Sequence, residues 1–104
     1  MANAGIYAQT LHYLKAVADM GVPAARADGA AVIARMKAMP TDDDCFGPGR
    51  IREDGRKLHP AYLMQVKTPA ESRERHDVLK PLATVPPEQA FRPLAEGGCP
   101  FIKA

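Results

Sequence analysis

The segment from Gly47 to Pro69 constrains the fold of this chain most strongly. Within it, Asp54-Gly55 is a strong turn signal, because glycine accepts the positive φ that a tight reversal needs. The residues after the turn alternate with the two-residue period of a strand, with Tyr62, Met64 and Val66 on one face and Leu63, Gln65 and Lys67 on the other. The pattern predicts a tight hairpin followed by a buried strand. No catalytic or metal-binding pattern accompanies it, which favours a binding protein over an enzyme.

The number of bulky apolar residues limits the core that this chain can build. Of its 104 residues 18 are Ala, whereas Leu, Ile, Val and Phe together number only 20. That is about a fifth of the chain, near the composition at which a core becomes hard to close. We therefore expect residues 1–104 to form a single, incomplete unit. Such a unit would pack against more of a longer chain or against a second copy as a homo-oligomer.

Charge and hydropathy exclude two classes of partner. The net charge of +2, from 14 basic and 12 acidic residues, is too small to favour nucleic acid or an anionic membrane surface. No stretch is long and apolar enough to span a bilayer. The N-terminal residues lack the basic and apolar regions of a secretory signal. As written, the chain is therefore expected to stay in the cytoplasm.

Two cysteines, Cys45 and Cys99, lie far apart, each beside loop-forming Gly and Pro. They are either two free thiols or a single disulfide, which would imply an oxidising compartment. Their spacing matches no zinc motif. Asp42, Asp43 and Asp44 lack the alternation, glycine and distal glutamate of a calcium-binding EF-hand loop, so a charged loop is expected there. We expect neither a metal nor a cofactor.

Hydrophobic periodicity predicts two N-terminal helices. The first covers residues 5–20 and ends at Gly21, with Pro23 beyond it. Its predicted buried stripe comprises Tyr7, Leu11, Leu14 and Ala18, widened by Ile6, Thr10, Tyr13 and Val17. The second begins after the N-cap Asp28 and runs to about Met39. Its predicted buried face consists of Val32, Ile33 and Met36.

The C-terminal half is predicted to contain a further strand and a short helix. Residues 77–85 suit a strand, in which Pro81 favours an edge position or a bulge because it cannot donate a hydrogen bond. Residues 88–94 suit a short helix, and residues 95–104 a tail along the surface. The predicted fold class is thus α/β, or α+β as an isolated piece. It has two helices, a hairpin, two further strands and a short C-terminal helix.

The residues that could carry chemistry are scattered. His12, His59 and His76 fall on a helix, at a strand entry and in a loop, and no nucleophile motif accompanies them. Tyr7 lies near the start of the first helix, where free backbone N–H groups could help to hold an anionic group of a ligand. These features predict no catalysis.

Taken in order, the elements resemble the C-terminal segment of the branched-chain amino acid (Leu/Ile/Val) binding proteins of ABC importers. The matching pieces are residues 4–17, 49–56, 62–72, 83–86, 88–94 and 99–103. The resemblance implies a type I periplasmic fold, in which two lobes enclose a solute. It also implies an ABC permease as partner and a periplasmic location.

The resemblance covers only about the last third of such a protein. It implies that the start of the first helix would line the cleft, so Tyr7 and Asn3 are the positions carried over as ligand-binding. The fragment alone is not expected to bind an amino acid with useful affinity. The alternative is a stand-alone structural module that self-associates without a ligand.

Overall fold

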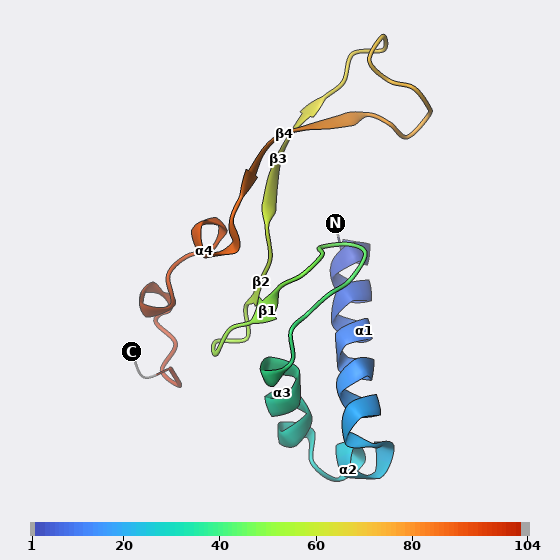
Figure 1. The fold of residues 1–104 in the computed structure, drawn as a ribbon. Coiled ribbons are helices and arrows are strands. Elements are labelled where there is room, and N and C mark those ends of the chain that lie inside the picture. Colours follow the sequence, from blue (N-terminus) through green and yellow to red (C-terminus); the bar gives the residue numbers. More distant parts are fainter. Residues whose placement is uncertain (1, 103–104) are drawn as a thin grey trace.

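The structure, a computed structural model, describes residues 2–102 as an extended molecule with helices at one end and a β-ribbon at the other (Figure 1). Its extents are 56 × 33 × 18 Å, and its radius of gyration is 17.3 Å. A compact domain of this length would have a radius of gyration of about 13 Å. The expectation of a mixed helix and strand fold is confirmed. The last two residues of the predicted tail, 103 and 104, lie outside the described residues.

Three helices form the N-terminal layer: α1 (Ala2–Met20), α2 (Val22–Ala27) and α3 (Gly29–Ala38). Gly21 ends α1 as predicted, with a φ of 83° that disfavours any residue with a Cβ. The short helix α2 was not predicted. Pro23 lies in its first turn, where the missing N–H of proline would have no helical partner in any case.

The N-cap of α3 is the one that the sequence predicts. Asp28 Oδ1 accepts hydrogen bonds from the backbone N–H of Ala30 at 2.9 Å and of Ala31 at 3.0 Å. These bonds satisfy two of the free donors of the first turn. The side chain of Asp28 thereby fixes where the chain leaves α2 and enters α3.

The core of the helical layer is small, and it contradicts the predicted buried face of α1. Ala16, Ala25 and Val32 form its buried cluster, and Ala8 and His12 are the other buried residues of α1. Of the predicted stripe, only Val17 packs against the cluster, while the side chains of Ile6, Tyr7, Tyr13 and Leu14 are exposed. The distance between packed helices depends on the side chains between them, and alanines allow α3 to come close. On α3, Val32 is 1% exposed as predicted, but Ile33 is 50% exposed.

The predicted hairpin is confirmed, with β1 (Arg50–Ile51) antiparallel to β2 (Lys57–Leu58). Gly55 has the positive φ, 84°, that the turn signal requires. Just before β1, Gly49 pairs with Thr41 through two backbone hydrogen bonds of 2.9 and 2.7 Å. A Cβ built on Gly49 would lie 2.3 Å from the backbone oxygen of Leu58, so only glycine fits this crossing.

The predicted strand after the hairpin forms, but the prediction that it is buried is wrong. Strand β3 (Ala61–Val66) pairs antiparallel with β4 (Leu79–Val85) in a two-stranded ribbon that projects beyond the helices (Figure 1). Five of the six residues of β3 are exposed, and Val66 reaches 73%. The alternation specified two faces correctly, but within residues 2–102 no layer covers either face. The ribbon has a register shift between Leu63 and Met64, opposite Pro81, as expected of a proline in a strand.

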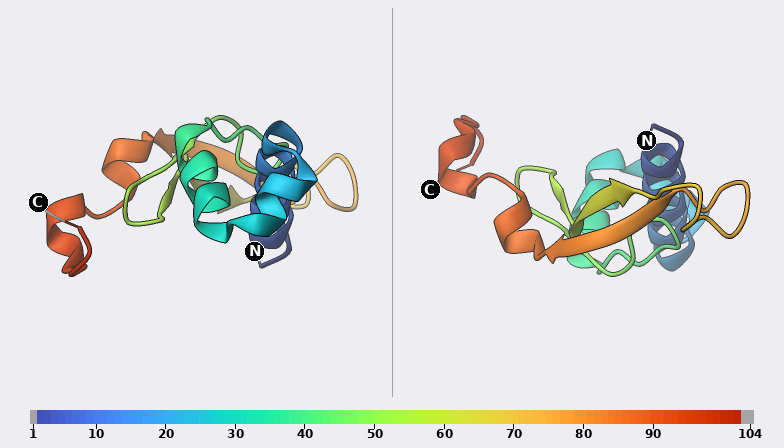
Figure 2. Two further views of the ribbon diagram at one scale, coloured as in Figure 1. Left: turned by 90° about the horizontal axis from the view of Figure 1, so that it is seen from below. Right: turned by 90° about the horizontal axis from the view of Figure 1, so that it is seen from above.

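The C-terminal segment is less helical than predicted and lies to one side of the helical layer (Figure 2). Helix α4 (Pro87–Ala90) is a single turn, and a 3₁₀-helix (Leu94–Gly97) follows it. Arg52 Nη1 donates a hydrogen bond of 2.9 Å to the carbonyl of Arg92. The His59 ring contacts both Phe46 and Phe91, with centroids 4.5 and 5.3 Å apart. These contacts hold the segment against the hairpin.

The loop between β3 and β4 is organised by the carboxylate of Glu71. It accepts hydrogen bonds from the side chain of Lys80, from the backbone N–H of Thr68 at 2.8 Å and from the Thr68 hydroxyl at 3.0 Å. The ammonium of Lys80, followed by these Thr68 bonds, lowers the pKa of Glu71 from 4.5 to about 2. Because the folded-state pKa is lowered, these bonds stabilise the loop fully above pH 4.5, and the contribution is lost as the pH falls towards 2.

We expect Lys80→Met to raise the pKa of Glu71 towards its ordinary value, because the largest cause of the shift is removed. The measurement is a ¹³C NMR titration of the Glu71 side-chain carboxyl. Lys67→Met is the matched control: its ammonium pairs with Asp77, so it should raise the pKa of Asp77 and leave that of Glu71 in place. An unchanged Glu71 titration in Lys80→Met would contradict this account of the loop.

Candidate functional site

The two predicted ligand-binding residues lie together in the first two turns of α1. Asn3 and Tyr7 are four residues apart, so their side chains are neighbours on one face of the helix. Both are exposed, Tyr7 to 46%. The helix begins at Ala2 rather than at the predicted residue 5. Asn3 is therefore in the first turn, among the backbone N–H groups without helical partners, whereas Tyr7 is one turn further on.

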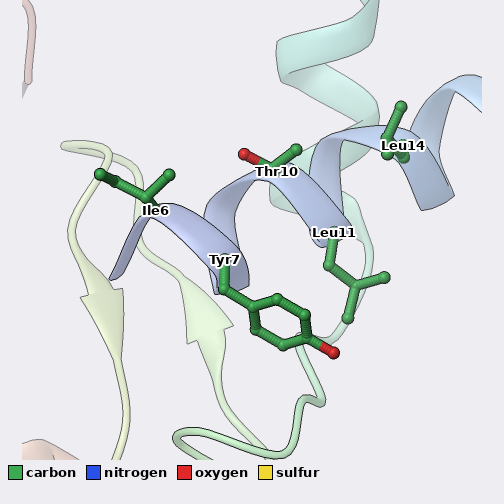
Figure 3. A pocket seen from close by; sticks show the side chains of 5 residues that line it. All are labelled: Ile6, Tyr7, Thr10, Leu11 and Leu14. Carbon is green, nitrogen blue, oxygen red and sulfur yellow. The ribbon is translucent and has the colours of Figure 1, made fainter. Parts of the chain in front are cut away.

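Tyr7 also lines a shallow groove of about 330 Å³ along the outer side of α1. The groove is lined by Ile6, Tyr7, Thr10, Leu11 and Leu14 (Figure 3). Tyr7 and Leu11 project from the same side of the helix, with the phenol ring beside Leu11 (Figure 3). Only the hydroxyls of Tyr7 and Thr10 are polar groups among these side chains. The groove suits an apolar surface or side chain, with the Tyr7 hydroxyl as a hydrogen-bonding group at its edge.

The three histidines lie in different places, as the sequence suggests. His12 is buried between α1 and α3, with Nε2 2.8 Å from the carbonyl oxygen of Met36, to which it donates as N–H. His59 lies in the aromatic contact with Phe46 and Phe91. His76 is exposed in the loop between β3 and β4. Among residues 2–102, no three His, Cys, Asp or Glu side chains are grouped so that they could hold a metal ion.

Asp43 has a structural role that the sequence reasoning missed. Its carboxylate accepts hydrogen bonds from the backbone N–H of Cys45 at 3.0 Å and of Phe46 at 2.9 Å, and it pairs with Lys57 of β2. Burial raises the pKa of Asp43, but the hydrogen bond from Lys57 and those from the backbone outweigh it, so the pKa is lowered overall. The sequence pattern that could have predicted this role is an Asp followed by turn residues, which is typical of an Asx-turn.

The two cysteines are free thiols in this structure, which corresponds to the first of the two alternatives left open by the sequence. Cys45 is exposed in the loop after Asp43, and Cys99 is half-buried in the C-terminal segment. Both cysteines lie outside α1, the helix that carries Asn3 and Tyr7. The candidate site therefore consists of the start of α1 and the groove beside it.

Residues 2–102 thus combine a mixed helix and strand fold with an exposed helix start and a shallow apolar groove. A family model described as periplasmic binding protein matches residues 1–73, and the chain belongs to this family. Members of the family are periplasmic substrate-binding proteins, which are not enzymes.

Two solved structures are similar to the chain. The first, a periplasmic binding protein from Burkholderia mallei, is 42% identical with a TM-score of 0.80, and the match covers 93% of this chain. The second is a branched-chain amino acid ABC transporter periplasmic ligand-binding protein from Burkholderia xenovorans, 36% identical with a TM-score of 0.72 over 86% of this chain. The matches cover only 24% and 23% of those two proteins, so the chain spans about a quarter of their length.

No curated protein sequence matches the chain at a significant level. Within the part of the chain that the structure describes, no helix has both the length and the apolar character needed to cross a membrane.

Proposed function

We propose that this chain is part of the solute-binding component of an ABC import system for amino acids or related small carboxylates. The observation that carries the proposal is the match of 93% of the chain, at 42% identity, to part of a periplasmic binding protein. The second similar structure is described as a branched-chain amino acid ligand-binding protein, which supports amino acids as the class of solute. An ABC permease is the partner that this role implies.

In this role, the start of α1 contributes to the solute cleft. The free N–H groups of the first turn carry partial positive charge and attract a carboxylate. Asn3 adds a side-chain amide in that turn, and the Tyr7 hydroxyl can donate a further hydrogen bond from the same helix face. Residues 1–104 correspond to about a quarter of the two similar proteins, so we expect these residues alone to bind no amino acid with micromolar affinity.

The test is a chimera in which this chain replaces the matching quarter of the Burkholderia xenovorans protein. We expect the chimera to bind at least one of leucine, isoleucine, valine or phenylalanine by isothermal titration calorimetry. Tyr7→Phe should weaken that binding about tenfold, because it removes one hydrogen bond to a charged group. Asn3→Ala should weaken it to a similar extent.

His76→Ala serves as the control variant, since His76 is exposed in the loop at the far end of the ribbon. It should leave the affinity unchanged. A chimera that folds, as judged by circular dichroism, but binds none of the four amino acids would contradict the proposal. Full affinity in Tyr7→Phe and Asn3→Ala would remove these two residues from the site.

A further inference from the structure

A cavity of about 210 Å³ lies on the inward side of α1, where this helix meets α3 and the β1–β2 hairpin. The residues that line it come from both helices, from the hairpin and from the loop after α3, and they include Ala8, His12, Met36, Thr41 and Ile51. The cavity is more enclosed than the groove on the outer side of the same helix. Mostly apolar walls with a few polar groups are typical of sites for small molecules.

The hydroxyl of Thr41 is a buried polar group without a partner. Thr41 is 2% exposed, and its Oγ1 forms no hydrogen bond with the described residues. An unpaired hydroxyl in the interior costs stability, and valine, which has a similar shape, would avoid that cost. A threonine that lines this cavity is explained if a bound molecule supplies the missing partner.

His12 contributes a second polar group to the same cavity. The ring is 5% exposed, and its Nε2 donates a hydrogen bond of 2.8 Å to the carbonyl of Met36. In the neutral ring this bond fixes the proton on Nε2, which leaves Nδ1 as an acceptor. A molecule that pairs with Nδ1 must therefore bring an O–H or N–H donor.

The charges around the cavity favour a neutral molecule. Lys57 also lines it, but its ammonium already donates to the carboxylate of Asp43 and lies 4.7 Å from the centre of the Phe46 ring. Gln9, a further polar residue of the lining, is uncharged. Among the described residues that line the cavity, the only charged side chain is thus paired. An engineered apolar cavity of about 150 Å³ binds benzene, so the volume here is sufficient for a ring with one substituent.

We propose that this cavity binds a small neutral molecule with an apolar body and one hydroxyl, of which phenol is the simplest probe. The hydroxyl donates to Nδ1 of His12 and accepts a hydrogen bond from the hydroxyl of Thr41, which satisfies both buried groups. The site lies on the inward side of α1, so the proposal does not depend on the solute site at Asn3 and Tyr7.

The test is a titration of the 104-residue chain with phenol, followed by long-range ¹H–¹⁵N NMR of the His12 imidazole. Phenol should shift the Nδ1 resonance in a saturable way, with a dissociation constant of about 1 mM. The Nε2 resonance should move little, because its bond to Met36 persists. Anisole, which has the same ring but no hydroxyl proton, should bind about tenfold more weakly.

Thr41→Val tests the second hydrogen bond. It should weaken phenol binding about tenfold, yet leave the free protein at least as stable, because it removes a buried hydroxyl that has no partner. Thr84→Val is the matched control, since Thr84 is exposed on the β3–β4 ribbon. It should leave the affinity for phenol unchanged.

The same measurements on the Burkholderia xenovorans chimera, without an amino acid, cover the case in which the isolated chain is not folded. An Nδ1 resonance that stays in place at about 20 mM phenol, far above the expected dissociation constant, would overturn the proposal and leave the cavity to water. Equal affinities for phenol and anisole would contradict it as well, and so would an unchanged affinity in Thr41→Val. The calorimetric result with amino acids bears only on the proposed function.

Discussion

Gly49→Ala should destabilise this protein by about 3 kcal/mol, the upper part of the range for an overpacked position. The added Cβ would lie 2.3 Å from the backbone oxygen of Leu58 and 3.0 Å from Thr41 Oγ1. The Leu58 oxygen cannot rotate away as a side chain would, so the backbone of the hairpin must shift. That shift would strain the two hydrogen bonds between Gly49 and Thr41. Urea unfolding followed by circular dichroism measures the loss.

Gly29→Ala is the matched control for this substitution. Gly29 is the first residue of α3, its φ is not in the left-handed region, and a Cβ there would meet nothing within 4 Å. The same chemical change should therefore stabilise the protein slightly, by up to about 1 kcal/mol, because alanine loses less backbone entropy than glycine in a helix. If Gly49→Ala were as stable as Gly29→Ala, the close approach of Gly49 to β2 would be refuted.

Val32→Asp is expected to have the largest effect of all, about 4 kcal/mol or more. Val32 is 1% exposed and lies in the cluster with Ala16 and Ala25. A carboxylate there would be buried without a partner in that apolar cluster, at a cost that the small helical core cannot offset. The three helices should separate, and the helical signal at 222 nm should fall at 25 °C.

Ile33→Asp is the control variant, because it separates the effect of burying a carboxylate from the effect of aspartate on helix stability. The residue is next to Val32 on the same helix but is 50% exposed. We expect it to cost about 1 kcal/mol, because its carboxylate stays in water. Comparable losses of helical signal in Val32→Asp and Ile33→Asp would show that α3 is buried on a different face from the one described.

Local features of the fold could be predicted from the sequence because each depends on a few adjacent residues. The end of α1 at Gly21, the N-cap at Asp28, the Asp54-Gly55 turn and the irregularity at Pro81 are all of this kind. Each follows from what one side chain, or its absence, does to the nearby backbone. The family was also correctly predicted, from the order of these pieces along the chain.

Burial could not be predicted in the same way, because it depends on segments distant in the sequence. On α1 the large apolar residues predicted the buried side, but Ala8, His12 and Ala16 occupy it. On β3 the alternation predicted a buried strand, and the structure leaves it exposed. Both errors have the same cause: the residues were assigned to a core that residues 2–102 do not supply. The predicted helix began at residue 5, so the sequence did not predict that Asn3 and Tyr7 are neighbours on α1. Their contact with a solute stays a proposal.

The β3–β4 ribbon is expected to unfold locally more readily than the helical layer. In an antiparallel pair with no third strand, about half of the amide groups point outward into water. Opening such a ladder disrupts few buried contacts, so its free energy is at the low end of the range for local unfolding. The ribbon can therefore open and re-form many times while the buried cluster of Ala16, Ala25 and Val32 remains intact. The rate of amide hydrogen exchange along β3 and β4 therefore measures whether a further strand or layer covers the ribbon.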